Sequence, residues 1–443
     1  MHQAKAVFMM VVYDTPESWL RQAIESVLQQ TCPDLYLLIQ DNGSTGRTAE
    51  ILREYAGRDT RIVLFRNEVN NAMTPEENAA WWNLVCRYTL ELESEYFAVL
   101  DSDDSYAPDF LEVMYQIATE KQADLVVCGT TMVDESGEKT LRERLPPALA
   151  LERREMSASQ FAQEYGSFRS VWGKLFRASL LWEYGNGFVQ AASQQVRNGA
   201  DTFCILYLMR KITRFVSVPK SLHTYRIRNA SVYQGTQGEL SPNRVREGEQ
   251  LFLAACQTAK SYTCLNWEAM HFLYDVYHYH IHDLLASLLD NPIMSPESKV
   301  SYFRTVLDAP LFAQIGETSN KMVWLVDQML LRLLTPAPPL PLEYCCSLLH
   351  RKDSAKQDIG KRQLLELLDR DAWEQARRVE AALVVQCPLD EELLYLRLRR
   401  MAGCGEDWEN ARHAAQIAQL LYPKNRAIAK LIEGLENRCE RER

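Results

Sequence analysis

Three acids stand within four residues in Asp101-Ser102-Asp103-Asp104, directly after the apolar stretch from Tyr96 to Leu100. Like charges packed this closely repel one another and raise one another's pKa values. Carboxylate oxygens are ligands that Mg²⁺ and Mn²⁺ prefer, and these ions often bridge a few carboxylates to substrate phosphates. The acids therefore indicate a divalent cation that stabilises charge on a leaving diphosphate. The alternative is an acidic loop that caps the helix expected near Pro108.

Alternating strands and helices are expected to position these acids. Apolar runs predict strands near residues 6–12, 35–39, 61–65, 96–100 and 124–128. Helices are expected to begin at Thr15-Pro16-Glu17 and near Thr48. Such an alternation implies an α/β fold with a mostly parallel sheet, in which ligands bind beyond the carboxyl ends of the strands. The acids after residue 100 and the turn Asp41-Asn42-Gly43-Ser44-Thr45 would both lie at that edge.

Composition narrows the class of protein. The chain has 443 residues, of which 47% are hydrophobic and 24% charged, with a formal net charge of -10. This is an ordinary globular composition with room for two or three domains, and an acidic chain is a poor candidate for nucleic-acid binding. No secretory signal or membrane span is evident. We expect a cytoplasmic protein, at most peripherally attached to the inner face of the cell membrane, whose scattered cysteines are reduced.

The later part of the chain has a helical pattern. After about residue 235 the strand pattern fades, and the proline-rich segment 335–341 predicts a linker. Trp373-Glu374-Gln375-Ala376-Arg377 recurs 35 positions later as Trp408-Glu409-Asn410-Ala411-Arg412. That spacing is close to the period of tetratricopeptide helix pairs, although a helical bundle with chance similarity is an alternative. We therefore expect domains at 1–235, 236–334 and 342–443, the last of them contacting a protein partner.

Four segments taken in order resemble the family 2 glycosyltransferases of the GT-A fold, over roughly residues 5–235. They are the apolar strand ending in Tyr13-Asp14, the helix with Ile24-Glu25-Ser26-Val27-Leu28, the Asp41 turn, and Asp101-Ser102-Asp103-Asp104. The resemblance implies a Rossmann-like GT-A domain followed by an all-α region. The sequence departs from the family pattern at four positions: Val11, Asn42, Gly46 and Ala200.

The resemblance implies roles for the first group of site residues. Asp103 would be the ligand of Mn²⁺ or Mg²⁺, with Asp101 near the ribose or a metal-bound water. Asp41 would accept a hydrogen bond from the nucleobase, most often uracil. Tyr13 and Asp14 would line the same nucleotide pocket.

Later segments extend the resemblance. The segment from Ser170 to Arg177, which contains Lys174, is similar to an element that walls the sugar and acceptor region. Asp201 stands where inverting members carry the general base, which takes the acceptor proton during in-line attack. The segment Tyr225 to Ser231 is similar to one that closes over the diphosphate. Three of its residues would hold that group: Arg226, Arg228 and Ser231.

The resemblance thus implies an inverting, metal-dependent glycosyltransferase of the hexosyl- or N-acetylhexosaminyltransferase class. Its partners would be a nucleotide diphosphate sugar, first of all a UDP-sugar, and a glycan or cell-surface polymer as acceptor. One alternative is a catalytically decayed relative that acts as a scaffold through its helical tail. Another is an aspartyl-phosphate phosphotransferase, in which the first acid of Asp101-Ser102-Asp103 is the nucleophile. That alternative leaves the Asp41 turn unexplained.

Overall fold

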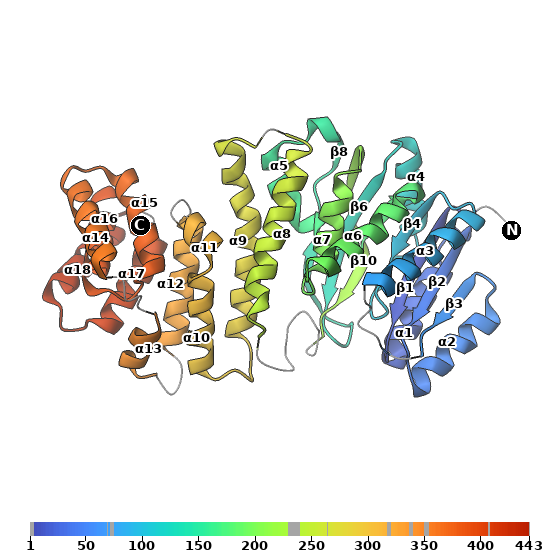
Figure 1. Cartoon of the computed structure of the whole chain (residues 1–443), viewed down its shortest axis with the longest axis horizontal. Helices are drawn as coiled ribbons and strands as arrows, with labels where there is room; N and C mark the ends of the chain where they lie inside the picture. Colours follow the sequence, from blue (N-terminus) through green and yellow to red (C-terminus); the bar gives the residue numbers. More distant parts are fainter. Residues whose placement is uncertain are drawn as a thin grey trace. The chain divides into compact units, whose positions relative to one another are not determined.

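The computed structural model describes residues 4–68, 70, 75–228, 240–263, 265–316, 320–335, 340–349, 354–405 and 408–442. The chain divides into two compact units (Figure 1). Unit 1 comprises Met1–Ser231 and Gln250–Val276, and unit 2 comprises Val232–Glu249 and Tyr277–Arg443. The boundary passes through the long helices α8 (Asn243–Lys260) and α9 (Trp267–Leu289). The division into domains at 235 and 342 stays a prediction.

Unit 1 is built on a ten-stranded sheet with the strand order β3-β2-β1-β4-β9-β6-β10-β5, in which β7 pairs with β6 and β8 with β10. The strands are β1 (Ala6–Val12), β2 (Leu35–Asp41), β3 (Ile62–Arg66), β4 (Tyr96–Val99), β5 (Ser105–Tyr106), β6 (Leu125–Val133), β7 (Thr140–Arg144), β8 (Leu149–Glu152), β9 (Lys174–Arg177) and β10 (Arg214–Arg226). The five expected strands are confirmed within a few residues. The half with β1 to β4 is parallel, whereas β9 runs antiparallel to both β4 and β6, so the sheet is mixed.

Buried side chains on both faces of the sheet explain the apolar runs. Phe8 and Met10 are fully buried and belong to one core with Leu20 of helix α1 (Glu17–Leu28) and Leu52 of helix α2 (Gly46–Arg58). Phe97 of β4 packs its ring against Phe176 and Tyr184, with centroids 4.9 and 5.3 Å apart. Because alternate residues of a strand face opposite sides, helices can cover both faces of the sheet.

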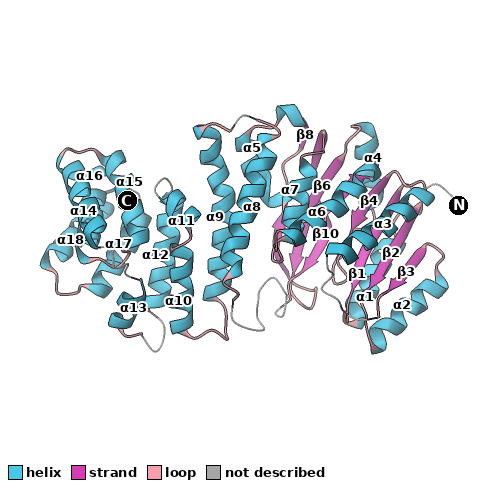
Figure 2. Cartoon of the chain, viewed as in Figure 1, coloured by secondary structure: helices cyan, strands magenta, loops and turns pink. Residues whose placement is uncertain are grey.

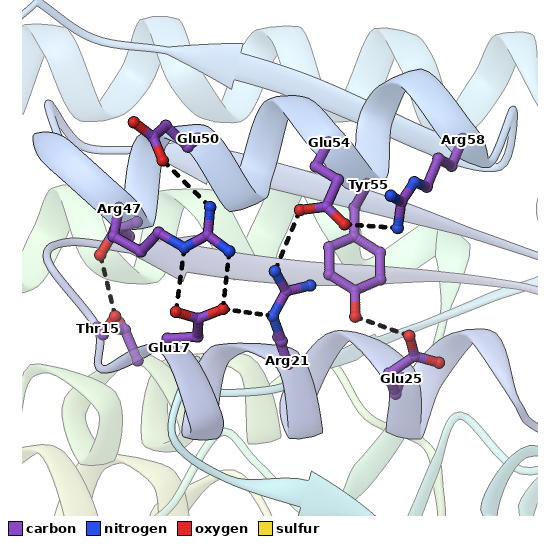
Figure 3. Close-up of polar contacts among 10 residues, drawn as sticks. Thr15, Glu17, Arg21, Glu25, Arg47, Glu50, Glu54, Tyr55 and Arg58 are labelled. Carbon is purple, nitrogen blue, oxygen red and sulfur yellow. Dashed lines mark hydrogen bonds and ion pairs between the residues drawn. The ribbon is translucent and has the colours of Figure 1, made fainter.

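The helices wholly within unit 1 are α1 (Glu17–Leu28), α2 (Gly46–Arg58), α3 (Pro75–Glu91), α4 (Phe110–Glu120), α5 (Ala158–Phe168), α6 (Leu181–Ser193) and α7 (Ala200–Met209). Charged side chains join α1 to α2 (Figure 3). Glu17 accepts hydrogen bonds from Arg21 and, through both oxygens, from Arg47. Arg21 also reaches Glu54, so the two helices are linked over more than one turn. Glu17 and Arg47 lie at the helix starts, next to the loops that follow β1 and β2.

The regular elements of unit 2, among its described residues, are all helices (Figure 2). Its helices beyond α9 are α10 (Pro296–Leu307), α11 (Pro310–Gly316), α12 (Asn320–Leu334), α13 (Leu342–Leu349), α14 (Ser354–Asp369), α15 (Trp373–Gln386), α16 (Glu391–Cys404), α17 (Trp408–Leu421) and α18 (Arg426–Glu442). Both copies of the 35-residue repeat begin a helix, α15 and α17. Tetratricopeptide pairing stays a prediction, and residues 336–339 of the expected linker lie outside the described residues. Within the described part of the chain, no helix is long and apolar enough to cross a bilayer.

Candidate active site

The loops after β1 and β4 meet at one edge of the sheet. These strands are neighbours and run parallel, so their carboxyl ends lie side by side. The hydroxyl oxygens of Thr15, after β1, and Ser102, after β4, are 2.7 Å apart and share a hydrogen bond. The structure therefore places the acidic loop, which we define as Asp101 to Asp104, beside the loop that contains Tyr13 and Asp14.

The acidic loop collects negative charge in a partly buried place. Burial raises the pKa of the Asp101 carboxyl well above its ordinary value, and the nearby charges of Asp104, Asp201 and Asp103 raise that pKa further. Arg228 opposes this rise. Within the described residues, the Asp101 side chain accepts no hydrogen bond. Asp101 is thus a carboxyl group that a cation or a ligand hydroxyl would stabilise.

Asp103 already has a cationic neighbour. Its Oδ2 is 2.7 Å from Nε of Arg228, and the two side chains are 11% and 37% exposed. Its backbone carbonyl accepts a hydrogen bond of 3.2 Å from Nε of Arg226. The two arginines expected to meet the diphosphate therefore both contact the acidic loop.

Arg226 is buried, and protein groups engage its guanidinium. Its Nη1 donates to the backbone carbonyl of Glu135, and its Nη2 donates to the side chain of Gln22. The guanidinium also lies over the Trp19 ring, 5.3 Å from the centroid. Arg228 is the more exposed of the two arginines, so it is better placed to meet a diphosphate directly.

Asp41 ends β2 and is fully buried. Its Oδ1 accepts a hydrogen bond from the backbone N–H of Ser44, and its Oδ2 accepts one from Nη1 of Arg66, both at 2.8 Å. Sequence reasoning missed Arg66, whose side chain is 46% exposed beside the expected nucleobase position. Arg66 ends β3 and is paired in register with Asp41. The strand alignment could have identified it, but a single sequence does not fix that register.

The loop after β1 is fastened to the Asp41 turn. Asp14 has a positive φ of 41°, and its Oδ1 accepts a hydrogen bond of 2.9 Å from the backbone N–H of Thr45. The Asp14 backbone N–H donates to Oγ of Ser44. Asp14 thus joins two loops, whereas the neighbouring Tyr13 is exposed at the edge where a nucleotide is expected.

Asp201 lies in the first turn of α7, after Gly199, whose φ of 91° is in the left-handed region that favours glycine. Burial raises the pKa of the Asp201 carboxyl to about 6, and the charge of Lys174 acts in the opposite direction. Its side chain has no hydrogen-bond partner within the part of the chain that the structure describes. A partly buried carboxylate with this pKa is suited to accept a proton near neutral pH.

Lys174, at the start of β9, lies beneath the site. It is 1% exposed, and its ammonium group donates to Oγ of Ser170 at 3.2 Å and to the carbonyl of Trp172 at 3.4 Å. Burial lowers the Lys174 pKa well below its ordinary value, while Asp201 raises it. Lys174 is therefore occupied by contacts inside the protein, and little of its surface is left to contact a nucleotide sugar directly.

An aromatic stack stands beside these groups. The Trp172 ring stacks on His223 and Tyr225, with centroids 4.8 and 5.2 Å apart, and the Arg144 guanidinium lies over it. Ser231 lies outside the described residues, so the predicted Tyr225 to Ser231 segment is seen only as far as Arg228.

The described residues offer few side-chain ligands for Mn²⁺ or Mg²⁺. Among the described residues, no group of three or more His, Cys, Asp or Glu side chains could hold a metal ion. Mg²⁺ is, however, often held by one or two carboxylates together with substrate phosphates and water. Asp101, whose carboxyl has no hydrogen-bond donor in the described chain, and Asp103 fit that arrangement.

The chain is similar in sequence to known glycosyltransferases. The family model described as glycosyl transferase family 2 matches residues 7–185. Glycosyltransferase GlyA of Streptococcus pneumoniae is 27% identical over 235 residues, which cover 52% of this chain and 31% of GlyA. TuaG of Bacillus subtilis, named for teichuronic acid biosynthesis, is 29% identical over 120 residues, covering 27% of this chain and 44% of TuaG. The chain thus spans less than half the length of these two curated relatives.

Among solved structures, the crystal structure of Staphylococcus aureus TarS aligns with a TM-score of 0.48 and 12% sequence identity. The alignment covers 74% of this chain and 52% of that chain.

Proposed function

We propose that the chain transfers a sugar from a nucleotide diphosphate sugar to a hydroxyl group, because residues 7–185 match the model of glycosyl transferase family 2. The observation that carries the proposal is that Asp201, a carboxyl without a hydrogen-bond partner in the described chain, lies near enough to Asp101 of the acidic loop for its charge to raise the Asp101 pKa. The loop supplies a place for the diphosphate and its cation. Asp201 supplies a base within electrostatic range of that loop.

The proposed reaction is a single displacement with inversion at the anomeric carbon. Asp201 accepts the proton of the acceptor hydroxyl as its oxygen bonds to the anomeric carbon. The bond between that carbon and the diphosphate oxygen breaks, and the nucleoside diphosphate leaves with the electron pair. A base that holds the hydroxyl in line supplies both proton transfer and orientation.

The leaving group needs positive charge as the bond breaks. Mn²⁺ or Mg²⁺, when bound, supplies electrostatic stabilisation of the developing diphosphate charge. Asp103 would hold the ion, with Asp101 beside it. Arg228 can neutralise phosphate oxygens, because guanidinium groups bind phosphate bidentately.

A UDP-sugar is the donor that we propose. Asp41 would accept a hydrogen bond from the base, and its present partner Arg66 would lie at the same position. Tyr13 would border the nucleotide. The acceptor that we propose is a glycan or cell-surface polymer, which agrees with the name of the relative TuaG, and we place the reaction in the cytoplasm.

A panel of nucleotide sugars tests the proposal. Each donor is added with Mn²⁺, and the unfolding temperature and the release of nucleoside diphosphate are measured, because a ligand that binds only the folded chain raises its stability. One UDP-sugar should stabilise the chain and be hydrolysed slowly, and Asp201→Asn should keep the stabilisation and lose the hydrolysis.

The same panel distinguishes the decayed scaffold, an alternative that Ala200 favours because family members usually carry an acid at that position. Binding without turnover by wild type, for every donor and acceptor mixture, would support the scaffold. An absence of binding to every nucleotide sugar would refute the proposed function.

A further inference from the structure

Asp104, the last residue of the acidic loop, is oriented differently from its neighbour Asp103. The Asp104 side chain is fully buried, whereas that of Asp103 is 11% exposed. Oδ1 of Asp104 accepts a hydrogen bond of 2.9 Å from the backbone N–H of Arg226, at the end of β10. Asp104 therefore faces the interior of unit 1 and contacts a strand that is remote in sequence.

The other oxygen of Asp104 faces a buried histidine. Oδ2 lies 3.4 Å from Nε2 of His223, and neither atom has a hydrogen-bond partner within the described residues. The His223 ring is 1% exposed and is packed between the Trp172 ring, 4.8 Å away, and the Tyr106 ring, 5.4 Å away. These rings hold the imidazole in place, so its Nε2 is kept facing the Asp104 carboxyl.

The strand that follows the loop reinforces this contact. In β5, Tyr106 and Ser105 pair with His223 and Thr224 of β10. The Tyr106 hydroxyl donates to the carbonyl of Val99, the last residue of β4, at 2.7 Å. The acidic loop is thus held at both ends, and the Asp104 side chain joins it to the backbone of β10.

We propose that Asp104 is a positioning residue, which together with His223 anchors the acidic loop to β10 and thereby directs Asp103 toward the cation and diphosphate of the donor. This inference rests on the proposed function. The Asp104 carboxyl is fully buried and bonded to β10, so the residue acts through Asp103. The anchor also fixes the Arg226 backbone, whose guanidinium contacts the Asp103 carbonyl.

Three substitutions distinguish an anchor from a metal ligand. Asp104→Asn keeps an oxygen for the Arg226 N–H and offers an amide N–H to His223, so Mn²⁺-dependent UDP binding should stay within about threefold of wild type. Asp104→Ala leaves the Arg226 N–H without its acceptor and removes the carboxyl that faces His223, so binding should weaken about tenfold or more. Asp103→Asn should lose the Mn²⁺ dependence of UDP binding. Calorimetry gives the affinities.

Unfolding without metal or nucleotide is the second readout. Asp104→Ala should unfold at least about 2 °C below wild type, whereas Asp103→Asn, which lacks the buried contact, should not. His223→Phe keeps a ring between Trp172 and Tyr106 but removes the nitrogen, and it should weaken UDP binding as Asp104→Ala does. This variant still tests the anchor if Asp104→Ala fails to fold.

Two results would overturn the anchor. One is an Asp104→Asn variant that loses Mn²⁺ dependence as fully as Asp103→Asn while its unfolding is unchanged, which would make Asp104 a ligand. The other is wild-type affinity and stability in Asp104→Ala or His223→Phe. If wild type itself binds no UDP, the proposed donor is wrong. The unfolding temperatures and Mn²⁺ affinities of the same variants then still show whether Asp104 anchors the loop.

Discussion

At the scale of single residues, Asp201 has both features that a general base needs, an unengaged carboxyl and a pKa near neutrality. Asp201→Asn preserves the size of the side chain but cannot take a proton at neutral pH. We expect sugar transfer to fall about 100- to 10,000-fold while donor affinity is unchanged, because the donor is held by other residues. Steady-state rates and UDP-sugar calorimetry measure the two quantities. Equal transfer rates of wild type and Asp201→Asn would mean that Asp201 has only a structural role at the start of α7.

The same residue predicts a pH dependence. Burial raises the Asp201 pKa to about 6, so the carboxyl becomes protonated, and inactive as a base, as the pH falls below that value. The transfer rate should therefore be level above about pH 7 and fall about tenfold per unit below pH 6. A pH–rate profile of wild type measures this, and the residual rate of Asp201→Asn should lack the same step. A wild-type profile that is flat down to pH 4.5 would contradict the assignment.

Removing the charge of Arg228 should strengthen the binding of Mn²⁺ rather than weaken it. Its guanidinium, 2.7 Å from Asp103, occupies the position that a cation would approach. Arg228→Met should therefore tighten Mn²⁺ binding in the absence of nucleotide, by about two- to tenfold, since the pair is partly solvent-screened. Arg142→Met on the exposed strand β7 is the matched control and should change nothing. Unchanged or weaker Mn²⁺ affinity in Arg228→Met would refute this competition.

At the scale of elements, the sequence was informative wherever an apolar run ends in polar residues. A strand that is buried on both faces has a continuous apolar sequence, so its end is visible where polar residues begin. The sequence therefore predicted the ends of β2 and β4, where Asp41 and the acidic loop lie. Contacts that depend on strand register or on long-range packing were not predictable. Arg66 reaches Asp41 only because β2 and β3 are aligned at those residues, and Arg226 is buried by partners on other elements.

The ion pairs between α1 and α2 predict a pH-dependent stability (Figure 3). Hydrogen bonds from Arg47 and Arg21 lower the Glu17 pKa to about 2. A lowered carboxyl pKa stabilises the fold above the unfolded value, near 4.5, and this contribution is lost as the pH falls toward 2. Glu17→Gln should thus unfold at a slightly lower temperature than wild type at pH 7, with the gap narrowing below pH 4.5. Since the pairs are exposed, 0.5 M salt should also narrow it.

A difference in unfolding temperature between wild type and Glu17→Gln that does not change with pH or salt would contradict this prediction. It would mean that Glu17 contributes through packing alone. The matched control is Glu50→Gln, which removes a single contact to Arg47 and should have a smaller effect.

At the scale of the whole molecule, the 35-residue repeat predicted helices in the tail. It did not predict which other helices these would pack against. Asp327 lies on α12, before the proline-rich segment, and Arg397 lies on α16, after it. Both are buried, and the arginine donates two hydrogen bonds to the carboxylate, at 3.2 and 2.7 Å. Glu380 of α15 completes the cluster with Arg400. This bidentate pair links α12 to α16 across the proline-rich segment, within unit 2.

This cluster gives the last prediction. Arg397→Met leaves Asp327 as a buried charge without its partner, which should cost unit 2 about 3–5 kcal/mol of unfolding free energy. Arg399→Met, two positions along the same helix, removes an exposed pair with Asp369 and should cost less than about 1 kcal/mol. The double variant Asp327→Leu, Arg397→Met removes both charges and should regain part of the loss, because the two effects are coupled. Denaturant unfolding followed by helical circular dichroism measures all three. Equal costs for Arg397→Met and Arg399→Met would show that the pair across the proline-rich segment does not hold α12 to α16.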